Sequence, residues 1–215
     1  MRTQLAAIAV LACSIPAYAD DVTYQRPVKA VANFVDAPPI PQANLSPDRS
    51  TLLLVTPIQF PSIAEVAEPE LRLAGLRINP RNRAMARRGF ARRLELLDVT
   101  AKSASPRPIR NLPDDARIDN IDWSPDGKYI AFTVAGADVI RLWLADVAAA
   151  TARELAVTPL SGVAGRPCSW LPDSRSLVCR AVPGDVKPAP VAPTVPTGPI
   201  VQENLGTKKP AQTNP

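Results

Sequence analysis

The residue types needed for nucleophilic hydrolysis are the first chemical groups to consider, and one of them is absent. The 215 residues contain no histidine, so neither a Ser-His-Asp nor a Cys-His arrangement finds its imidazole proton carrier within this chain. There is no Gly-x-Ser-x-Gly segment, because Ser161 is followed by Gly162 but has Pro159 where the first glycine belongs. No serine has a lysine three residues later. The sequence therefore predicts no catalytic residue and no activity of this chain alone.

Oxygen ligands for a metal ion occur in the segment 122–127, whose Asp-x-Ser-x-Asp-Gly spacing imitates the start of a calcium loop. Pro125 lies inside this segment, and Thr133 stands where such a loop needs a bidentate glutamate. A typical catalytic zinc site would need imidazole ligands. We therefore predict no metal site and no cofactor.

Neighbouring acidic residues are the remaining candidates for general acid and base catalysis. They are Asp114 with Asp115, and Glu68 with Glu70. Such a role needs a carboxyl group whose pKa is raised by burial or by a like charge, and the flanking sequence indicates neither. We predict that all four carboxyl groups lie on the solvated surface.

Two cysteines, Cys168 and Cys179, flank ten residues that read as strand, tight turn and strand. The midpoint of this segment falls between Asp173 and Ser174, so a hairpin brings the cysteines to directly opposed positions, about 4.5 to 5.5 Å apart. The sequence predicts a cross-strand disulfide, which persists in an oxidising compartment. The alternative is a pair of buried free thiols, and a thiolate nucleophile is disfavoured because no base could activate it.

Seven arginines and no acidic residue lie between positions 77 and 93. We interpret this range as a solvated, arginine-rich loop. Binding of nucleic acid is disfavoured because Phe90 is the one aromatic residue in the range, whereas single-strand platforms need several, so we predict no nucleic-acid partner. The remaining alternative is contact with an acidic surface, either anionic lipid or acidic peptide.

Three segments, 43–55, 121–133 and 168–182, repeat one pattern: an apolar strand start, a Ser/Leu-Pro-Asp turn and a second apolar strand. Proline suits the second position of a type I turn, aspartate the third, and a residue with positive φ ends it. The turn prolines are spaced by 78 and then 47 residues, which indicates one repeat period with a copy missing or degraded in the first gap. A period of about 45 residues is typical of a four-stranded propeller blade.

Further strands are expected at 93–99 and 139–147, which both end in an apolar-Asp-Val sequence. A short helix is expected at 62–67, where Ser62 and Glu65 form a capping box. The 25 prolines disfavour long helices. The tryptophans, which we expect in the sheet core, are Trp123, Trp143 and Trp170.

The two ends of the chain differ from the repeats. Residues 1–19 have the organisation of a secretory signal peptide, with Arg2, an apolar stretch and Ala17-Tyr18-Ala19 before the cleavage point. We expect export to the periplasm or the extracellular space; the alternatives are a buried or interfacial helix, or lipoprotein cleavage at Cys13. No further segment is long and apolar enough to predict a membrane span. Residues 183–215 hold eight prolines and are expected to form an extended, disordered linker or tail.

The hairpin at 121–133 resembles those of TolB-like propellers and of the propeller domain of prolyl oligopeptidase-family serine peptidases. Three further stretches, 36–41, 69–80 and 195–203, favour the peptidases. Together they resemble the N-terminal propeller half of secreted bacterial peptidases akin to plant glutamyl endopeptidase. In that family the propeller is followed by an α/β-hydrolase domain that carries Ser, Asp and His.

This resemblance implies an all-β fold over residues 20–182, an incomplete β-propeller of about three blades of four-stranded antiparallel sheet. We expect a truncated, inactive part of an exported serine peptidase, whose peptide substrates are met only through a catalytic domain absent from this chain. An unclosed propeller leaves sheet edges through which the chain could associate. The alternative is a periplasmic TolB-like module that binds another protein.

Overall fold

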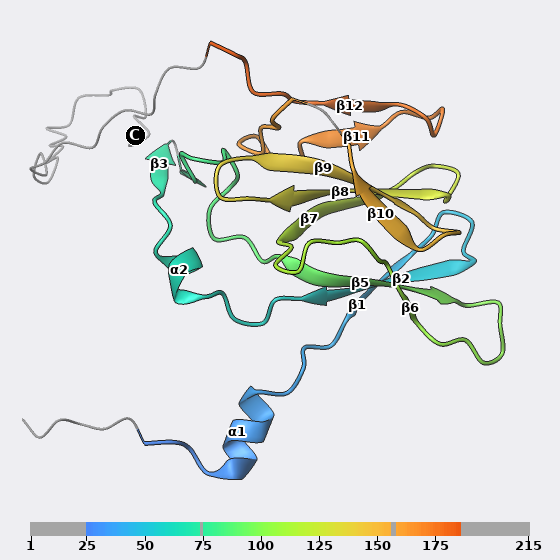
Figure 1. Ribbon diagram of the computed structural model, residues 1–215, viewed down its shortest axis with the longest axis horizontal. Helices are drawn as coiled ribbons and strands as arrows, with labels where there is room; N and C mark the ends of the chain where they lie inside the picture. The colour runs from blue at the N-terminus through green and yellow to red at the C-terminus, as the bar shows by residue number, and fades with distance from the viewer. Residues whose placement is uncertain (1–24, 74, 156–157, 186–215) are drawn as a thin grey trace, which may run out of the picture. The chain divides into compact units, whose positions relative to one another are not determined.

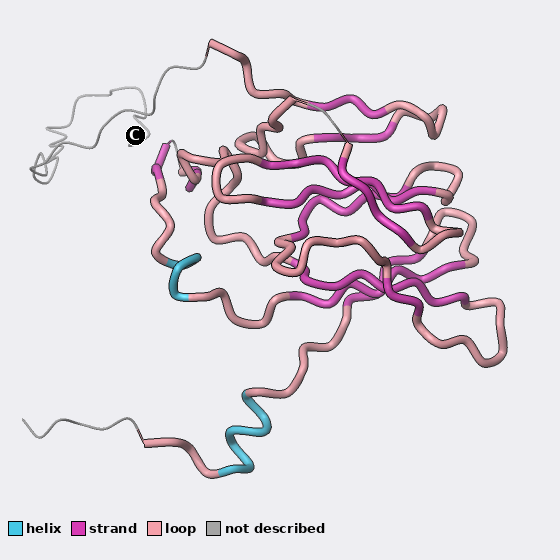
Figure 2. Tube along the Cα trace, viewed as in Figure 1, coloured by secondary structure: helices cyan, strands magenta, loops and turns pink. Residues whose placement is uncertain are grey.

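The computed structural model describes residues 25–73, 75–155 and 158–185, in which β-strands are far more extensive than helices (Figure 2). The expected signal peptide, 1–19, and residues 186–215 of the expected tail lie outside the described residues. The elements in chain order are α1 (Lys29–Val35), β1 (Gln42–Leu45), β2 (Thr51–Pro57), α2 (Ile63–Val66), β3 (Leu71–Leu73), β4 (Leu76–Ile78), β5 (Ala91–Asp98), β6 (Arg107–Pro108), β7 (Ile118–Trp123), β8 (Tyr129–Ala135), β9 (Ile140–Asp146), β10 (Thr151–Glu154), β11 (Cys168–Trp170) and β12 (Leu177–Cys179).

The chain divides into two compact units, one ending at Ala37 and the other beginning at Pro38. The helix α1 belongs to the first unit and was not anticipated from the sequence. Its N-cap residue, Val28, makes no side-chain capping bond, and none of its residues is buried. Neither a capping residue nor a buried apolar face therefore marks this helix in the sequence.

The second unit begins with an antiparallel meander in which β1, β2, β5 and β6 are neighbours in that order (Figure 1). Residues 58–90 leave the meander after β2 and return at β5. We call this range the insertion; it contains α2 and the two-stranded sheet β3–β4. Within it, Ser62 caps α2 by accepting a hydrogen bond from the backbone N–H of Glu65, as expected from the sequence.

The insertion explains the unequal spacing of the repeats. Removing its 33 residues from the 78 residues between Pro47 and Pro125 leaves 45, close to the 47 between Pro125 and Pro172. The expectation of a missing or degraded copy is therefore wrong. The first gap holds one four-stranded meander that is interrupted between its second and third strands.

A second antiparallel meander follows, formed by β7, β8, β9 and β10 in sequence order. It adjoins the first through a pairing of Ala91 with Ile118. The third repeat is represented by the two-stranded hairpin β11–β12. The described residues thus contain two complete four-stranded meanders and the first two strands of a third, instead of three four-stranded units.

The three repeated turns share one hydrogen-bonding pattern, which explains why the same short sequence recurs. In each turn the backbone N–H of the first residue donates to the carbonyl five residues later: Ser46 to Thr51, Ser124 to Tyr129, and Leu171 to Ser176. The fourth residue has positive φ in all three: Arg49 at 64°, Gly127 at 72° and Ser174 at 56°. The turn aspartates, Asp48, Asp126 and Asp173, each accept a backbone N–H two residues later.

Two apolar clusters hold the sheets together. The first joins both meanders and includes the fully buried Leu53, Leu94, Ile130 and Phe132, with Trp123 at 9% exposure. The second lies between β9 and the third hairpin and includes Leu142, Leu160 and Cys168. The expectation of core tryptophans is confirmed for Trp123, whereas Trp143 and Trp170 are partly buried and pack against the first and second cluster respectively. No helix in the described ranges is long and apolar enough to cross a membrane.

Candidate functional site

A cavity of about 440 Å³ opens between the insertion and the start of β7. Its floor is largely apolar and its rim carries arginines and glutamates. The lining residues are Ile58, Gln59, Pro61, Glu65, Val66, Glu68, Glu70, Asn79, Asn82, Ala84, Met85, Ala86, Arg87, Arg88, Gly89, Phe90 and Arg117. All but Arg117 belong to the insertion, which makes this loop the structural basis of the site.

Glu70 is the centre of an ion-pair cluster at the rim. Its carboxylate lies 3.2 Å from the guanidinium of Arg72, 2.8 Å from Arg77 and 2.9 Å from Arg87. The Glu70 side chain is 16% exposed, whereas the side chains of its three arginine partners remain 41% to 70% exposed. The cluster ties β3 and β4 to the loop that follows them.

Burial raises the pKa of Glu70, but hydrogen bonds from Arg72 and Arg87, with the charges of Arg77 and Arg87, outweigh it and leave the pKa below its usual range. The group is therefore a carboxylate at neutral pH. A general acid would need the opposite shift. Glu70 organises the loop and has no free proton to give.

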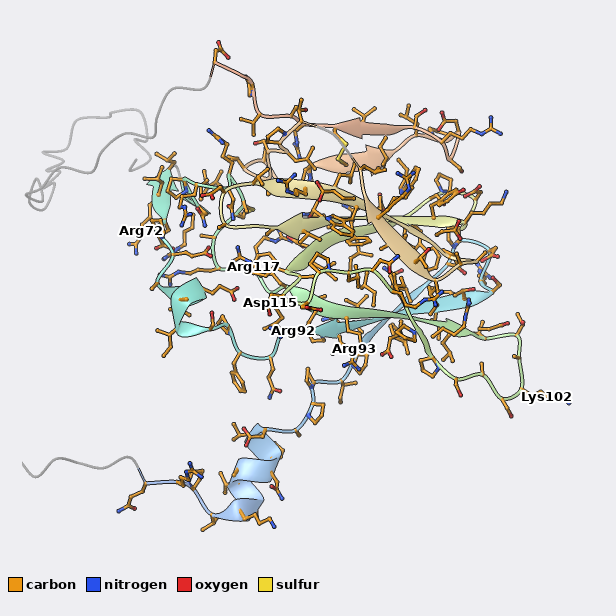
Figure 3. All side chains as sticks on the ribbon, in the orientation of Figure 1. Arg72, Arg92, Arg93, Lys102, Asp115 and Arg117 are labelled. Carbon is orange, nitrogen blue, oxygen red and sulfur yellow. A yellow bond between two sulfur atoms is a disulfide. The ribbon has the colours of Figure 1, made fainter. Side chains whose placement is uncertain are left out.

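Arg117 attaches the insertion to the second meander (Figure 3). Its guanidinium donates to the carboxylate of Glu68 at 2.8 Å and to the backbone carbonyls of Ala135 and Gly136, both at 3.1 Å. The same group lies 5.4 Å from the ring centroid of Phe90. One side chain thus bridges the loop, the cavity wall and the end of β8.

Two buried asparagines complete the attachment. The side-chain amide of Asn82 donates to the carbonyl of Gly136 at 2.8 Å, and its oxygen accepts the backbone N–H of Ala84 at 2.9 Å. The amide of Asn79 donates to Glu68 at 2.7 Å. Because these polar groups are buried and paired, they fix the backbone that lines the cavity.

The expectation that Glu68 and Glu70 are solvated is wrong, because both carboxylates are held by arginines. Arg117, the ion-pair partner of Glu68, lies 49 residues away in the sequence, and Arg87, one of the three arginines that hold Glu70, lies 17 residues away. Asp114 and Asp115 are exposed, as expected. Among the four acids the structure brings together only Glu68 and Glu70, on one rim of the cavity.

The arginine-rich range is a loop over much of its length, but more of its arginines make ion pairs than the expectation of a solvated loop implied. Four of its seven arginines make ion pairs: Arg77 and Arg87 with Glu70, Arg81 with Asp138, and Arg88 with Asp119. Within the described part of the chain, the three that make no ion pair are Arg83, Arg92 and Arg93; the last two are exposed on β5 (Figure 3). The four paired arginines share three carboxylates, so the range keeps a net positive charge.

The acidic residues of segment 122–127, whose spacing imitates the start of a calcium loop, make hydrogen bonds and an ion pair within the protein. Asp126 accepts the hydroxyl of Ser124 at 2.7 Å and the backbone N–H of Lys128 at 3.1 Å. Asp122 pairs with Arg166 at 2.8 Å. Over the described ranges, no three His, Cys, Asp or Glu residues are grouped as metal ligands would be. The absence of a metal ion and of a cofactor stays a prediction.

The predicted disulfide is present between Cys168 and Cys179, whose Cα atoms are 4.1 Å apart. These residues are directly paired in the β11–β12 register, as the symmetric spacing about the turn predicted. The bond closes the third hairpin at the end away from its turn. Its position beside the second apolar cluster indicates a structural function.

The amino-acid sequence of the chain is similar to those of two plant proteins that are named as peptidases. The chain is 31% identical over 193 residues to a rice (Oryza sativa subsp. japonica) protein named probable glutamyl endopeptidase, chloroplastic, a match that covers 84% of this chain and 20% of that protein. An Arabidopsis thaliana protein of the same name is 30% identical over 192 residues, with the same coverage. The chain therefore spans about a fifth of the length of these curated relatives.

Among solved structures, an acylaminoacyl peptidase from Pyrococcus horikoshii matches 67% of this chain and 17% of its own, with a TM-score of 0.36 and 15% identity. No family model matches the chain.

Proposed function

The chain is a relative of the peptidases named glutamyl endopeptidase, and from this premise we propose that it forms part of the β-propeller of an exported serine peptidase. The single observation that carries the proposal is the sequence identity of about 30% along most of the chain. The two successive antiparallel meanders, each opened by the same Pro-Asp turn, support it, since radially repeated four-stranded sheets are what a propeller is made of.

In this proposal the chain forms part of a scaffold that controls the access of peptides to the active site. Hydrolysis is carried out by another part of the enzyme. Peptide hydrolysis of this class needs a nucleophilic serine with a histidine base, and the 215 residues contain no histidine. The propeller would sit over a catalytic domain and admit peptides to it. Peptides are then the substrates of the whole enzyme, and the 215-residue chain alone is inactive.

The insertion is the part of the chain that we propose to contact the substrate. It carries the cavity, and Arg117 and Asn82 fix it to the sheet, so its geometry is set independently of any ligand. Its apolar floor, formed by residues such as Phe90 and Met85, suits a side chain or a turn of an extended peptide. The guanidinium groups of Arg87 and Arg88, which also line the cavity, would add positive charge for an acidic residue of that peptide.

The test compares two proteins on a quenched fluorescent peptide that contains glutamate. One is the pure 215-residue chain, and the other is the product of the reading frame extended beyond the codon for Pro215. We expect the extension to encode a Gly-x-Ser-x-Gly segment followed by Asp and His, and we expect only the extended product to hydrolyse the peptide and to react with a fluorophosphonate. Turnover by the pure 215-residue chain would overturn the proposal.

An extension without these residues, together with a soluble and monodisperse 215-residue chain, would instead favour the interaction module. Export is tested separately by fusing residues 1–25 to alkaline phosphatase, which is active only after it has left the cytoplasm. We expect an active fusion, and an inactive one when residues 5–12 are deleted. An inactive fusion with the intact leader would contradict export.

A further inference from the structure

The third hairpin ends in a strand that is paired on one side only. In each complete meander the second strand lies between two partners: β2 between β1 and β5, and β8 between β7 and β9. In the described part of the chain, β12 pairs with β11 alone, and Figure 1 shows it at the boundary of the sheets. Among the described residues, none occupies beside β12 the place that β5 and β9 fill in the first two repeats.

The side chains show the same difference. Aligning the repeats on their turns makes Leu53, Ala131 and Val178 equivalent, each at the seventh position after the first turn residue. Leu53 is 0% exposed and Ala131 is 3% exposed, whereas Val178 is 61% exposed. An apolar position that is buried in both complete repeats is thus open in the third.

The backbone of β12 offers hydrogen-bonding groups on this open side. The carbonyl of Ser176 and the N–H of Arg180 bond toward the first strand, to Leu171 and Pro167 respectively. Because successive backbone groups of a strand alternate in direction, the N–H and C=O groups of Leu177 and Cys179 face the free edge. Cys179 on this strand is joined to Cys168 on β11 by the disulfide.

The strands that fill the equivalent edges share a sequence. Residues 94–99 of the first repeat read Leu-Glu-Leu-Leu-Asp-Val, and residues 142–147 of the second read Leu-Trp-Leu-Ala-Asp-Val. Their second leucines lie opposite Leu53 and Ala131. Their last residues close the pairing in the same way: the N–H of Val99 donates to the carbonyl of Ser50, and that of Val147 to Lys128, both at 3.0 Å.

We propose that the free edge of β12 binds an antiparallel strand of the sequence Leu-x-Leu-(Leu/Ala)-Asp-Val, supplied by polypeptide outside these 215 residues. The sequence occurs twice in the chain, and both copies are already paired in β5 and β9. In the repeated register the second leucine covers Val178 and the aspartate lies opposite Ser176, next to the exposed Arg175. The final N–H then donates to the carbonyl of Arg175.

The direct test uses a fluorescent synthetic peptide with the sequence of residues 141–147, added to the full 215-residue chain. We expect saturable binding of one peptide per chain by fluorescence anisotropy. In the register of β9, the amides of the tryptophan and alanine residues face β12, while those of the two leucines face away. N-methylation of the first pair should weaken binding by about tenfold or more, and N-methylation of the leucines should leave it within about twofold.

A substitution on the protein provides the matching control. Val178→Asp places a charge where the leucine must pack, and should abolish binding while the disulfide and the circular dichroism spectrum are kept. Val28→Asp changes a similarly exposed valine, 71% against 61%, which lies before α1 and outside the cavity, and should bind the peptide as the unchanged protein does. Equal loss with both variants, equal loss with both N-methylation patterns, or no binding would overturn the proposal.

A second copy of the chain is the competing occupant of this edge. Sedimentation of the 215-residue chain should show a monomer, and a dimer that Val178→Asp dissociates would refute an outside strand. The inference rests on the proposed propeller, because it treats β11–β12 as the start of a third blade. Strand binding and hydrolysis are measured separately, so peptide binding can fail while the extended product is active, and the reverse.

Discussion

The backbone N–H of Asp126 donates a hydrogen bond to the hydroxyl oxygen of Ser174 across 3.0 Å, and so joins the turn of the second repeat to the turn of the third. The first turn lies next to the second, since a Cβ built on Gly127 would lie 3.6 Å from Oδ1 of Asp48. Trp170 adds a bond from its indole N–H to the carbonyl of Asp122 at 3.2 Å. Equivalent turns therefore contact one another in succession, and the repeats are held together at their turn ends.

Acid should destabilise these turns. Hydrogen bonds from Ser46, Ser124 and Ser176, in that order, are the main causes that hold the pKa values of Asp48, Asp126 and Asp173 below the usual range. A carboxyl group with a lowered pKa stabilises the fold above its unfolded pKa of about 3.9, and this contribution is lost as the pH falls through the folded pKa. Urea unfolding should give a constant free energy between about pH 7 and 5 and a falling one below about pH 4.

The variant Asp126→Asn tests this assignment, because it removes one of the three titrating groups. It should be less stable at neutral pH and show a shallower loss of stability in acid. The control is Asp114→Asn, at an exposed carboxyl outside the turns. Identical acid profiles for Asp126→Asn and the unchanged protein would show that the turn carboxylates do not carry the effect.

Removing Glu70 should loosen the insertion without unfolding the sheets. Glu70→Ala leaves the guanidinium groups of Arg72, Arg77 and Arg87 without their shared partner. Trypsin should then cleave after Arg77 and Arg87 severalfold faster, because cleavage follows local opening. The control is Asp138→Ala, which breaks the highly exposed pair with Arg81 and should change little. Equal cleavage rates in the two variants would contradict a central function for Glu70.

Loss of the disulfide should lower the stability of the third hairpin. The bond closes a short loop, with a sequence separation of 11, so the double variant Cys168→Ala/Cys179→Ala should lose about 2 to 3 kcal/mol in urea unfolding. Mass spectrometry before and after reduction should show a gain of two hydrogens for the unchanged protein. An unchanged mass on reduction, with free thiols in the oxidised sample, would refute the bond.

Substitution at the fourth turn position should change the free energy of unfolding in opposite directions in the first and second repeats. Gly127 has φ of 72° and space for a Cβ, so Gly127→Ala should cost about 1 kcal/mol through the backbone conformation alone. Arg49 holds φ of 64° with a side chain, so Arg49→Gly should be neutral or stabilise by a few tenths to about 1 kcal/mol. Destabilisation by both changes would mean that side-chain contacts, and not φ, decide this position.

The predictions from the sequence that were correct depended on local sequence patterns. The three hairpins follow from Pro-Asp turns, and the disulfide from the symmetric placement of Cys168 and Cys179, because both depend on residues close in the chain. Four-stranded units were expected, but the positions of the fourth strands were not predicted, because β6 has two residues and β10 has four, too few for a periodic pattern. The helix α1 carries no capping signal either.

The site was missed because its contacts are long-range. Glu68 meets Arg117 across 49 positions, and Asn82 meets the carbonyl of Gly136 across 54. One signal was available in the composition: three glutamates, at 65, 68 and 70, precede the seven arginines of 77–93. Opposite charges in adjoining segments indicate mutual neutralisation, and would have argued against a freely solvated loop.

Pro57 and Ala91, the residues on either side of the insertion, face each other in the β2–β5 register, and the N–H of Ile58 still donates to the carbonyl of Phe90 at 2.7 Å. The loop consequently departs from and rejoins the sheet at a single point, so a change in its length need not shift the register of β2 against β5. Its sequence is more constrained than its length, because a replacement loop would have to restore the contacts that Asn82 and Ala84 make with the second meander.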